Sequence, residues 1–244
     1  SAASDVYKRQ FLSRLRWHCH FIQKLEDEPS LEFKPMNIMY DGLRENSNLD
    51  YLNAWKKGET GYPMVDACMR CLISTGWLNF RMRAMLVSFA CNNLWIDWKV
   101  VAENLGPLFV DYEPGIHYPQ VQMQAGITGI NTVRIYNPIK QGLDHDPNGL
   151  FIKRWVPELK STHKAIIHTP WLDQNNKYII PIVDEAISRK AAADKIYEVR
   201  RRKDHPEHSG RVLKKHGSRT VSYTHLRAHE TREDLVWRGV VEKK

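Results

Sequence analysis

The chain has 244 residues, of which 42% are hydrophobic and 26% are charged, and these shares are typical of a globular protein, not of a disordered one. No apolar run approaches the roughly 20 residues that a membrane span needs, so we expect no membrane partner. The sequence has four cysteines and no secretory signal, which is typical of a reducing compartment, so we expect a cytoplasmic protein. The formal net charge of +8 favours an anionic partner such as nucleic acid.

Both ends of the chain lack a helical or strand period that connects with their neighbours. Residues 1–10 and 220–244 resemble translated sequencing-adapter read-through, of the kind found at the ends of metagenomic open reading frames. We therefore expect both to be non-native, adapter-derived ends and exclude them from the fold. This leaves a domain over 11–203 and a native tail over 204–219, which we expect to be a piece of a longer protein.

Amphipathic helical spacing dominates the middle of the chain. Thr60–Pro63 is typical of a helix start, with proline in the first turn, and this helix is expected to end at Gly76. A second helix is predicted over 79–95, because one face collects apolar residues while Arg81 and Arg83 point elsewhere.

Two further helices are predicted, over 97–109 and over the charged segment 184–203. Residues 111–141 lie between them and are rich in Gly, Pro, Asn and Gln, so we expect a long irregular stretch of the functional kind. No segment alternates with period two for long enough to indicate a sheet. The predicted fold class is therefore all-α.

The most specific signal is a series of short motifs in a fixed order. They are Trp55-x-x-Gly58-x-Thr60-Gly61-Tyr62-Pro63, Thr75-Gly76-Trp77, Ile96-Asp97-Trp98, Asp111-x-Glu113, Arg134-Ile135-Tyr136-Asn137-Pro138, Asp146-Pro147-x-Gly149 and Trp155-Val156-Pro157-Glu158-Leu159. Taken alone, the first of them is only a capped helix with aromatic ends. Together they resemble the flavin-binding domain of the photolyase and cryptochrome family.

The resemblance implies a helical FAD-binding domain of the photolyase/cryptochrome type, with FAD facing a basic cavity for a base pair flipped out of DNA. In photolyases the excited, reduced flavin gives an electron to a pyrimidine dimer, the dimer splits, and the electron returns. The implied function is a blue-light-driven, deoxyribodipyrimidine photo-lyase-type repair of pyrimidine dimers in DNA. The alternatives are a cryptochrome-like photoreceptor that binds FAD and signals through an unknown partner, and a helical domain that has lost the cofactor.

Five residues stand at positions where the family contacts the cofactor, and two of them differ from the usual family residue. Arg83 and Asp111 match an ion pair beside the flavin ring, and Glu113 stands where the family usually has aspartate. Trp17 matches the tryptophan of a Trp-Arg-Glu motif and is expected to contact cofactor or lesion. His117 replaces an asparagine opposite the reactive nitrogen of the flavin, so a group that can donate a proton near neutral pH faces the redox centre.

A second group matches the DNA side of the cavity. Trp77 matches an aromatic residue of the cavity wall, Trp55 one beside it, and Arg81 a residue near a phosphate. Phe80 replaces an asparagine that lies close to the substrate, and Cys19 replaces the acidic residue of the Trp-Arg-Glu motif. Two polar contacts to a dimer are therefore missing, which argues against repair of the usual dimer.

The route by which electrons reach the flavin is also altered. The family's three relay tryptophans fall on Val121, Trp98 and Glu45, so one of the three is kept. Because valine cannot carry an oxidised hole, photoreduction is expected to use Trp95 with Trp98, to use Tyr118, or to fail. The residues expected to take part in the chemistry are Trp17, Trp77, His117 and Trp98.

The pair Cys68-x-x-Cys71, with Cys91 and Cys19 elsewhere, raises the question of an iron–sulfur cluster. The pair falls within a predicted helix beside apolar positions, so we expect small buried thiols and no metal. The family's antenna domain and its FAD phosphate-gripping loop lie outside the matching segment. An antenna chromophore is therefore expected only in the missing N-terminal domain, and FAD binding by this chain is expected to be weak.

Overall fold

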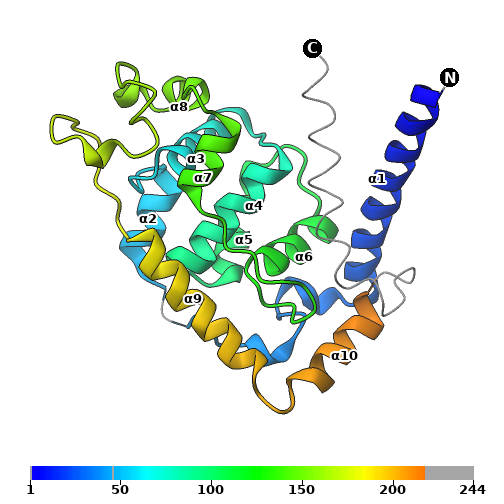
Figure 1. Ribbon diagram of the computed structural model, residues 1–244. Helices are drawn as coiled ribbons and strands as arrows, with labels where there is room; N and C mark the ends of the chain where they lie inside the picture. The colour runs from blue at the N-terminus through cyan, green and yellow to red at the C-terminus, as the bar shows by residue number, and fades with distance from the viewer. Residues whose placement is uncertain (1, 46, 218–244) are drawn as a thin grey trace.

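The computed structural model describes residues 2–45 and 47–217, and these ranges contain helices and no β-strand (Figure 1). The prediction of an all-α fold is confirmed. The predicted adapter-derived end at 220–244 lies outside the described residues. The α-helices are α1 (Ala2–Asp27), α2 (Leu49–Lys57), α3 (Pro63–Thr75), α4 (Phe80–Ser88), α5 (Trp98–Leu105), α6 (Pro114–Gln124), α7 (Pro138–His145), α8 (Leu150–Trp155), α9 (Glu185–Arg200) and α10 (His205–His216).

Helix α3 begins and ends as predicted. Pro63 opens its first turn, and Gly76 ends it in the left-handed conformation at φ 71°. A buried carboxylate fixes the loop before it, because Asp66 accepts hydrogen bonds from Thr60 N at 2.8 Å, from Thr60 Oγ1 at 2.7 Å and from Gly61 N at 3.0 Å. Tyr178 Oη donates to the same side chain at 2.6 Å, which attaches a distant segment to α3.

Helix α4 starts as predicted but is shorter. The side chain of Asn79 caps it by accepting a hydrogen bond from Met82 N at 3.0 Å. The α-helix ends at Ser88 and continues as a π-helical turn over Phe89–Asn93. The apolar face predicted for this segment is confirmed, because all five of its members are buried: Met82, Met85, Leu86, Phe89 and Ala90.

The prediction of one irregular stretch over 111–141 is wrong, because it contains α6. Glu113 caps α6, Pro114 is its first residue, and Pro119 lies inside it. Pro119 removes one backbone donor, and composition therefore argues against a helix. Packing of α6 against α1, α4 and α5 overrides that local preference, which is how tertiary contacts commonly decide such segments.

Residues 2–10 form the first turns of α1, so the expectation that they share no helical period with their neighbours is wrong. The adapter origin of this segment stays a prediction. Figure 1 shows the N-terminal half of α1 projecting from the other helices, and its apolar side chains are correspondingly exposed. The exposed ones are Val6, Tyr7, Phe11, Leu12 and Leu15.

The predicted tail at 204–219 also holds a helix, α10. The carboxylate of Glu28, at the end of α1, lies 2.6 Å from Nε2 of His216 and 2.9 Å from Nζ of Lys215. At the other end of α10, His205 Nε2 lies 3.0 Å from Tyr40 Oη. Helix α9 begins after Asp184, close to the predicted start, and leads into α10. No helix within 2–45 or 47–217 has the length and apolar character to cross a membrane.

Candidate functional site

Arg83 on α4 and Asp111 before α6 form the expected ion pair. Arg83 Nη2 donates to both carboxylate oxygens, at 3.0 and 2.9 Å. Arg83 Nε donates to the carbonyl oxygen of Leu78 at 2.7 Å, and the guanidinium carbon lies 4.2 Å from the centroid of the Phe109 ring. The Asp111 side chain is 50% exposed, and a pair in this setting contributes only about 0–1 kcal/mol to stability. The pair therefore adds little to the stability of the fold.

His117 on α6 lies within the same group of side chains. Its Nε2 donates to the carbonyl oxygen of Ala102 at 2.9 Å, which leaves Nδ1 as an acceptor. Its ring meets the edges of three aromatic rings, with centroid distances of 6.2 Å to Phe109, 5.2 Å to Tyr112 and 5.4 Å to Tyr118. Burial lowers the pKa of His117, the hydrogen bond to Ala102 opposes this, and the charge of Arg83 adds to it. The lowered pKa favours the neutral ring, in which Nδ1 is the acceptor, and the expectation that His117 donates a proton to the flavin stays a prediction.

Glu113 lies between Asp111 and His117 in the chain. It is the N-cap residue of α6, and its Oε1 accepts a hydrogen bond from Gly115 N at 3.2 Å. Asp111 precedes it by two residues, and His117 follows it by one helical turn. The ion pair, Glu113 and His117 therefore surround one helix end, where the helix dipole adds partial positive charge.

Trp17 lies on α1, partly buried, and α1 packs on α6. Its ring contacts two residues of its own helix, His20 at a centroid distance of 5.6 Å and Phe21 at 6.0 Å. Among the described residues, no ring contact joins Trp17 to His117 or to the Phe109 ring. Its predicted contact with cofactor or lesion stays a prediction.

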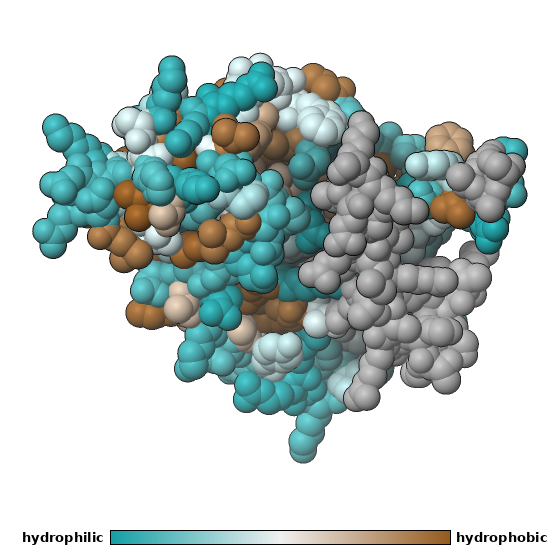
Figure 2. Space-filling model, turned by 45° about the horizontal axis from the view of Figure 1, so that its top comes forward, coloured by the Kyte–Doolittle hydropathy of each residue, from teal (hydrophilic) through white to brown (hydrophobic). Residues whose placement is uncertain are grey.

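Trp77 and Phe80 are two exposed aromatic side chains on either side of Leu78 in the chain, and we refer to them as the aromatic rim. They keep 55% and 54% of their surface exposed, although large aromatic side chains are usually buried. Leu78 lies between them in sequence, and its carbonyl oxygen holds Arg83. Arg81 follows on α4 and is partly buried. Figure 2 shows that apolar side chains on the face it displays form several patches separated by polar ones.

The structure places Trp55 in the core, which corrects its assignment to the DNA surface. Its exposed fraction is 0%, and its indole nitrogen has no hydrogen-bond partner within the described ranges. A side chain without exposed surface has no face on which a base could stack. Trp98, at the start of α5, is also buried, with 5% of its surface exposed.

The residues expected at the relay positions differ in burial. Val121 is buried on α6, and Glu45 is exposed. Trp95 has a left-handed backbone, with φ 56°, and lies between two cations. The Arg44 guanidinium carbon is 4.5 Å from its ring centroid, and Lys195 Nζ is 4.4 Å from it.

The sequence did not indicate three side chains of this site. Phe109 and Tyr112 contact the His117 ring, and Glu32 accepts a hydrogen bond from Tyr118 Oη at 3.3 Å. Tyr118 itself was considered only as one route for electrons. Aromatic residues clustered between Phe109 and Tyr118 were the available signal, but no local pattern connects Glu32 with them.

The expectation of buried thiols is confirmed for three cysteines. Cys68 and Cys71 lie on α3, Cys91 lies in the π-helical turn, and all three are buried, whereas Cys19 is exposed. Burial raises the pKa of the Cys68 thiol well above its usual value, and such a thiol is a small apolar side chain. Within the described part of the chain, no three His, Cys, Asp or Glu side chains group as metal ligands.

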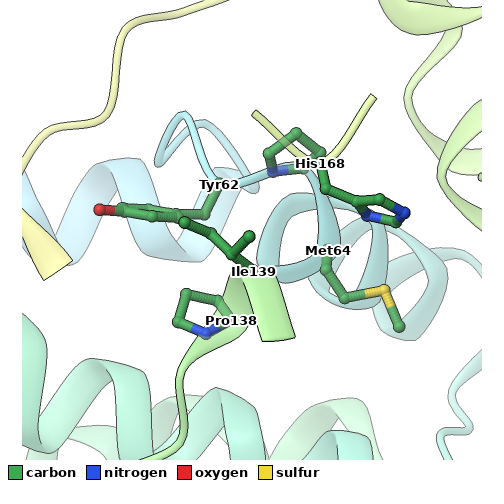
Figure 3. A pocket seen from close by; sticks show the side chains of 6 residues that line it. Tyr62, Met64, Pro138, Ile139 and His168 are labelled. Atoms are coloured by element: carbon green, nitrogen blue, oxygen red, sulfur yellow. The ribbon is translucent and has the colours of Figure 1, made fainter. Parts of the chain in front are cut away.

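A small hollow between α3 and α7 is a separate feature. It is lined by residues that include Tyr62, Met64, Ile139 and His168. Figure 3 shows the rings of Tyr62 and His168 on opposite sides of Ile139. Its enclosed volume is about 0 Å³, whereas ligand pockets usually measure about 300–1,000 Å³, so this hollow does not hold a flavin.

The side chains around the start of α6 fit FAD in their chemistry. The pyrimidine part of a flavin ring presents carbonyl oxygens and an N–H group. Arg83 offers a donor to such oxygens, whereas Asp111, Glu113 and Nδ1 of His117 offer acceptors. Arg83 lies on α4, and the other three residues lie just before α6 or in its first turn. They would hold the polar edge of the ring.

Comparison with known proteins gives the family. Residues 11–198 match the FAD-binding domain of DNA photolyase, which is more than half of the chain. The chain therefore belongs to the photolyase and cryptochrome family, as the motif series predicted. FAD is the cofactor of this domain.

Three relatives illustrate the match. A deoxyribodipyrimidine photo-lyase of Alkalihalophilus pseudofirmus is 33% identical over 208 residues, which cover 79% of this chain and 43% of that protein. Cryptochrome DASH of Danio rerio is 40% identical over 132 residues, which cover 54% of this chain and 25% of that protein. An archaeal photolyase structure from Sulfolobus tokodaii with two FAD molecules gives a TM-score of 0.72 at 32% identity and covers 78% of this chain and 44% of that one. The chain thus spans less than half the length of these relatives.

Proposed function

We propose that this chain is the flavin-binding and DNA-contacting part of a light-driven lyase that splits pyrimidine dimers in DNA. One observation carries the proposal. Arg83, which pairs with Asp111, donates through Nε to the carbonyl oxygen of Leu78, and Leu78 lies in the chain between the exposed side chains of Trp77 and Phe80. A cofactor-holding group and a base-stacking surface are thereby adjacent.

FAD, when bound and reduced, supplies the light-excited electron for cleavage of the dimer. In this proposal Arg83 donates to a carbonyl oxygen of the flavin ring, while Asp111 and Glu113 accept from its N–H group. The ion pair keeps both charges in place, since Arg83 is also held by a backbone carbonyl and an aromatic ring. His117 turns Nδ1 toward the ring as an acceptor, because its Nε2 proton is engaged by Ala102.

The rim of Trp77 and Phe80 receives the damaged bases in this proposal. A lesion must leave the base stack to reach a buried cofactor, and unstacking costs a few kcal/mol, least for damaged pairs. Stacking on an aromatic side chain returns about 1–3 kcal/mol per base. We assign Trp17 to the same cavity and Arg81 to the DNA phosphates on the strength of the family motifs.

A second candidate is a photoreceptor that binds FAD and signals without repair. Two substitutions favour it, since Phe80 and Cys19 stand where photolyases have polar contacts to the lesion. Both side chains are exposed. The relative named cryptochrome DASH shows that the likeness extends to that branch of the family.

One experiment separates the two candidates. The chain is loaded with FAD, reduced, and illuminated with blue light in the presence of an oligonucleotide that contains one thymine dimer. The lyase predicts light-dependent loss of the dimer and recovery of two thymines, measured by chromatography. A flavin that is reduced by light while the dimer remains intact would instead support the photoreceptor.

A further inference from the structure

The altered relay leaves open which side chain reduces the flavin. Val121 stands where the family motifs imply the tryptophan nearest the flavin, and an aliphatic side chain cannot be oxidised by one electron under these conditions. Trp95 is a poor substitute, because Arg44 and Lys195 lie over its ring at 4.5 and 4.4 Å. A cation is attracted to the neutral ring but opposes a positive charge on it, so these contacts make Trp95 harder to oxidise.

Tyr118 has the opposite environment. Its ring is 8% exposed and lies on α6, and its hydroxyl donates to Oε1 of Glu32 at 3.3 Å. Oxidation of a phenol makes its proton strongly acidic, and a hydrogen-bonded carboxylate can accept that proton as it leaves. Burial raises the pKa of Tyr118, and the neighbouring Tyr112 and Glu32 add to this, so the phenol holds its proton until it is oxidised.

Tyr118 is also in contact with the candidate flavin site. Its ring centroid lies 5.4 Å from that of His117, whose ring in turn lies 6.2 Å from Phe109, beneath the Arg83 guanidinium. A continuous group of side chains therefore runs from Glu32 through Tyr118 to the residues that hold the flavin. Val121 lies three residues further along α6, so Tyr118 is close to the lost relay position.

We propose that Tyr118 is the electron donor for photoreduction of the flavin, with Glu32 as the acceptor of its proton. This inference rests on the flavin site proposed above. Tyr118 loses one electron to the light-excited, oxidised flavin; its O–H bond breaks and an O–H bond forms on Glu32, which leaves a neutral tyrosyl radical. An added thiol then returns a hydrogen atom to Tyr118, two thiyl radicals combine to a disulfide, and Glu32 releases its proton to water.

The test uses the full chain loaded with FAD, in blue light with excess thiol, and follows the oxidised flavin band. Tyr118→Phe should slow photoreduction by about tenfold or more, because phenylalanine has no phenol group that could give an electron to the flavin and its proton to Glu32. Tyr197→Phe is the matched control, since Tyr197 is a 43% exposed tyrosine of α9 outside this group of side chains. Its rate should stay within about twofold of the wild type. Equal rates in all three proteins would overturn the inference.

Electron paramagnetic resonance of frozen, illuminated samples gives a readout independent of rate. The wild type should show a tyrosyl radical whose splitting collapses with ring-deuterated tyrosine, and Tyr118→Phe should lack it. A tryptophan radical in the wild type would contradict the proposal. A wild-type chain that takes up no FAD would overturn the proposed function as well, whereas normal uptake with unchanged photoreduction in Tyr118→Phe overturns this inference alone.

The flavin-free chain tests the contact between the two residues directly. Titration of phenol absorbance with base should show that Glu32→Gln lowers the pKa of one tyrosine. The same substitution made in the Tyr118→Phe protein should leave the titration curve unchanged. If Glu32→Gln has no effect in either background, Glu32 is not the partner of Tyr118.

Discussion

The α carbon of Ile22 on α1 lies where a side chain on Gly115 of α6 would begin. A β carbon built on Gly115 would come within 2.7 Å of it, a distance that real β carbons essentially never show. The two helices therefore cross at this glycine. The crossing fixes α1, which carries Trp17, relative to the helix that carries His117.

Gly115→Ala should destabilise the protein by about 1–3 kcal/mol, because α1 must move away from α6. The measurement is urea denaturation followed by circular dichroism. Gly210→Ala on α10 is the control, since a β carbon there meets no atom within 4 Å. That substitution should be neutral or stabilise by about 0.5–1 kcal/mol through helix propensity. Equal effects of the two substitutions would show that the crossing is loose.

Trp77→Ala should weaken binding of dimer-containing DNA about 5–30-fold, since it removes roughly 1–2 kcal/mol of stacking. Because Trp77 is exposed, the thermal midpoint of unfolding should not change. Leu172→Ala is the control, as Leu172 is 72% exposed outside the rim. Fluorescence anisotropy of a labelled oligonucleotide provides the measurement. A loss of affinity in the Leu172 variant of the same size would rule out a specific role of the rim.

His117 makes a prediction about pH. Its pKa is lowered on folding, chiefly by burial, so the unfolded chain takes up a proton near pH 6.5 more readily than the folded chain does. The stabilisation is complete above that pH and is lost as the pH falls through the folded-state pKa. His117→Asn should therefore make the loss of stability between pH 7.5 and 5.5 smaller than it is in the wild type.

Urea denaturation at each of these pH values measures the effect. His18→Asn is the control, because His18 is an exposed histidine of α1. An identical pH dependence for His117→Asn and the wild type would show that His117 protonates freely in the folded protein.

The helices that could be predicted carry their own signals. Pro63 and Gly76 define α3 through backbone conformation, and Asn79 and Asp184 define the starts of α4 and α9 through caps. Helix α6 could not be found in this way, because its prolines and glycine oppose a helix and its stability comes from packing. Helix α10 was missed for a related reason, since contacts with Glu28 and Tyr40 hold its two ends.

In the candidate site, too, residues in local motifs could be predicted and long-range contacts could not. Arg83, Asp111 and His117 were found because they stand in recognisable motifs. Trp55 stands in such a motif too, but its burial depends on which helices pack over it. The partnership of Tyr118 and Glu32 spans 86 positions and follows from no local pattern. Residue types could thus be predicted, whereas exposure and long-range pairing could not.

The most direct test of the flavin site compares two arginine pairs of the same chain. Arg83 pairs with Asp111 and Arg70 pairs with Glu158, both at 2.9 Å and with similar exposure. FAD is titrated into the wild type, Arg83→Ala and Arg70→Ala, and binding is followed by quenching of flavin fluorescence. The account predicts that Arg83→Ala weakens binding by about tenfold or more, as expected for a lost charged hydrogen bond, while Arg70→Ala does not. Equal affinity of Arg83→Ala and the wild type would contradict it.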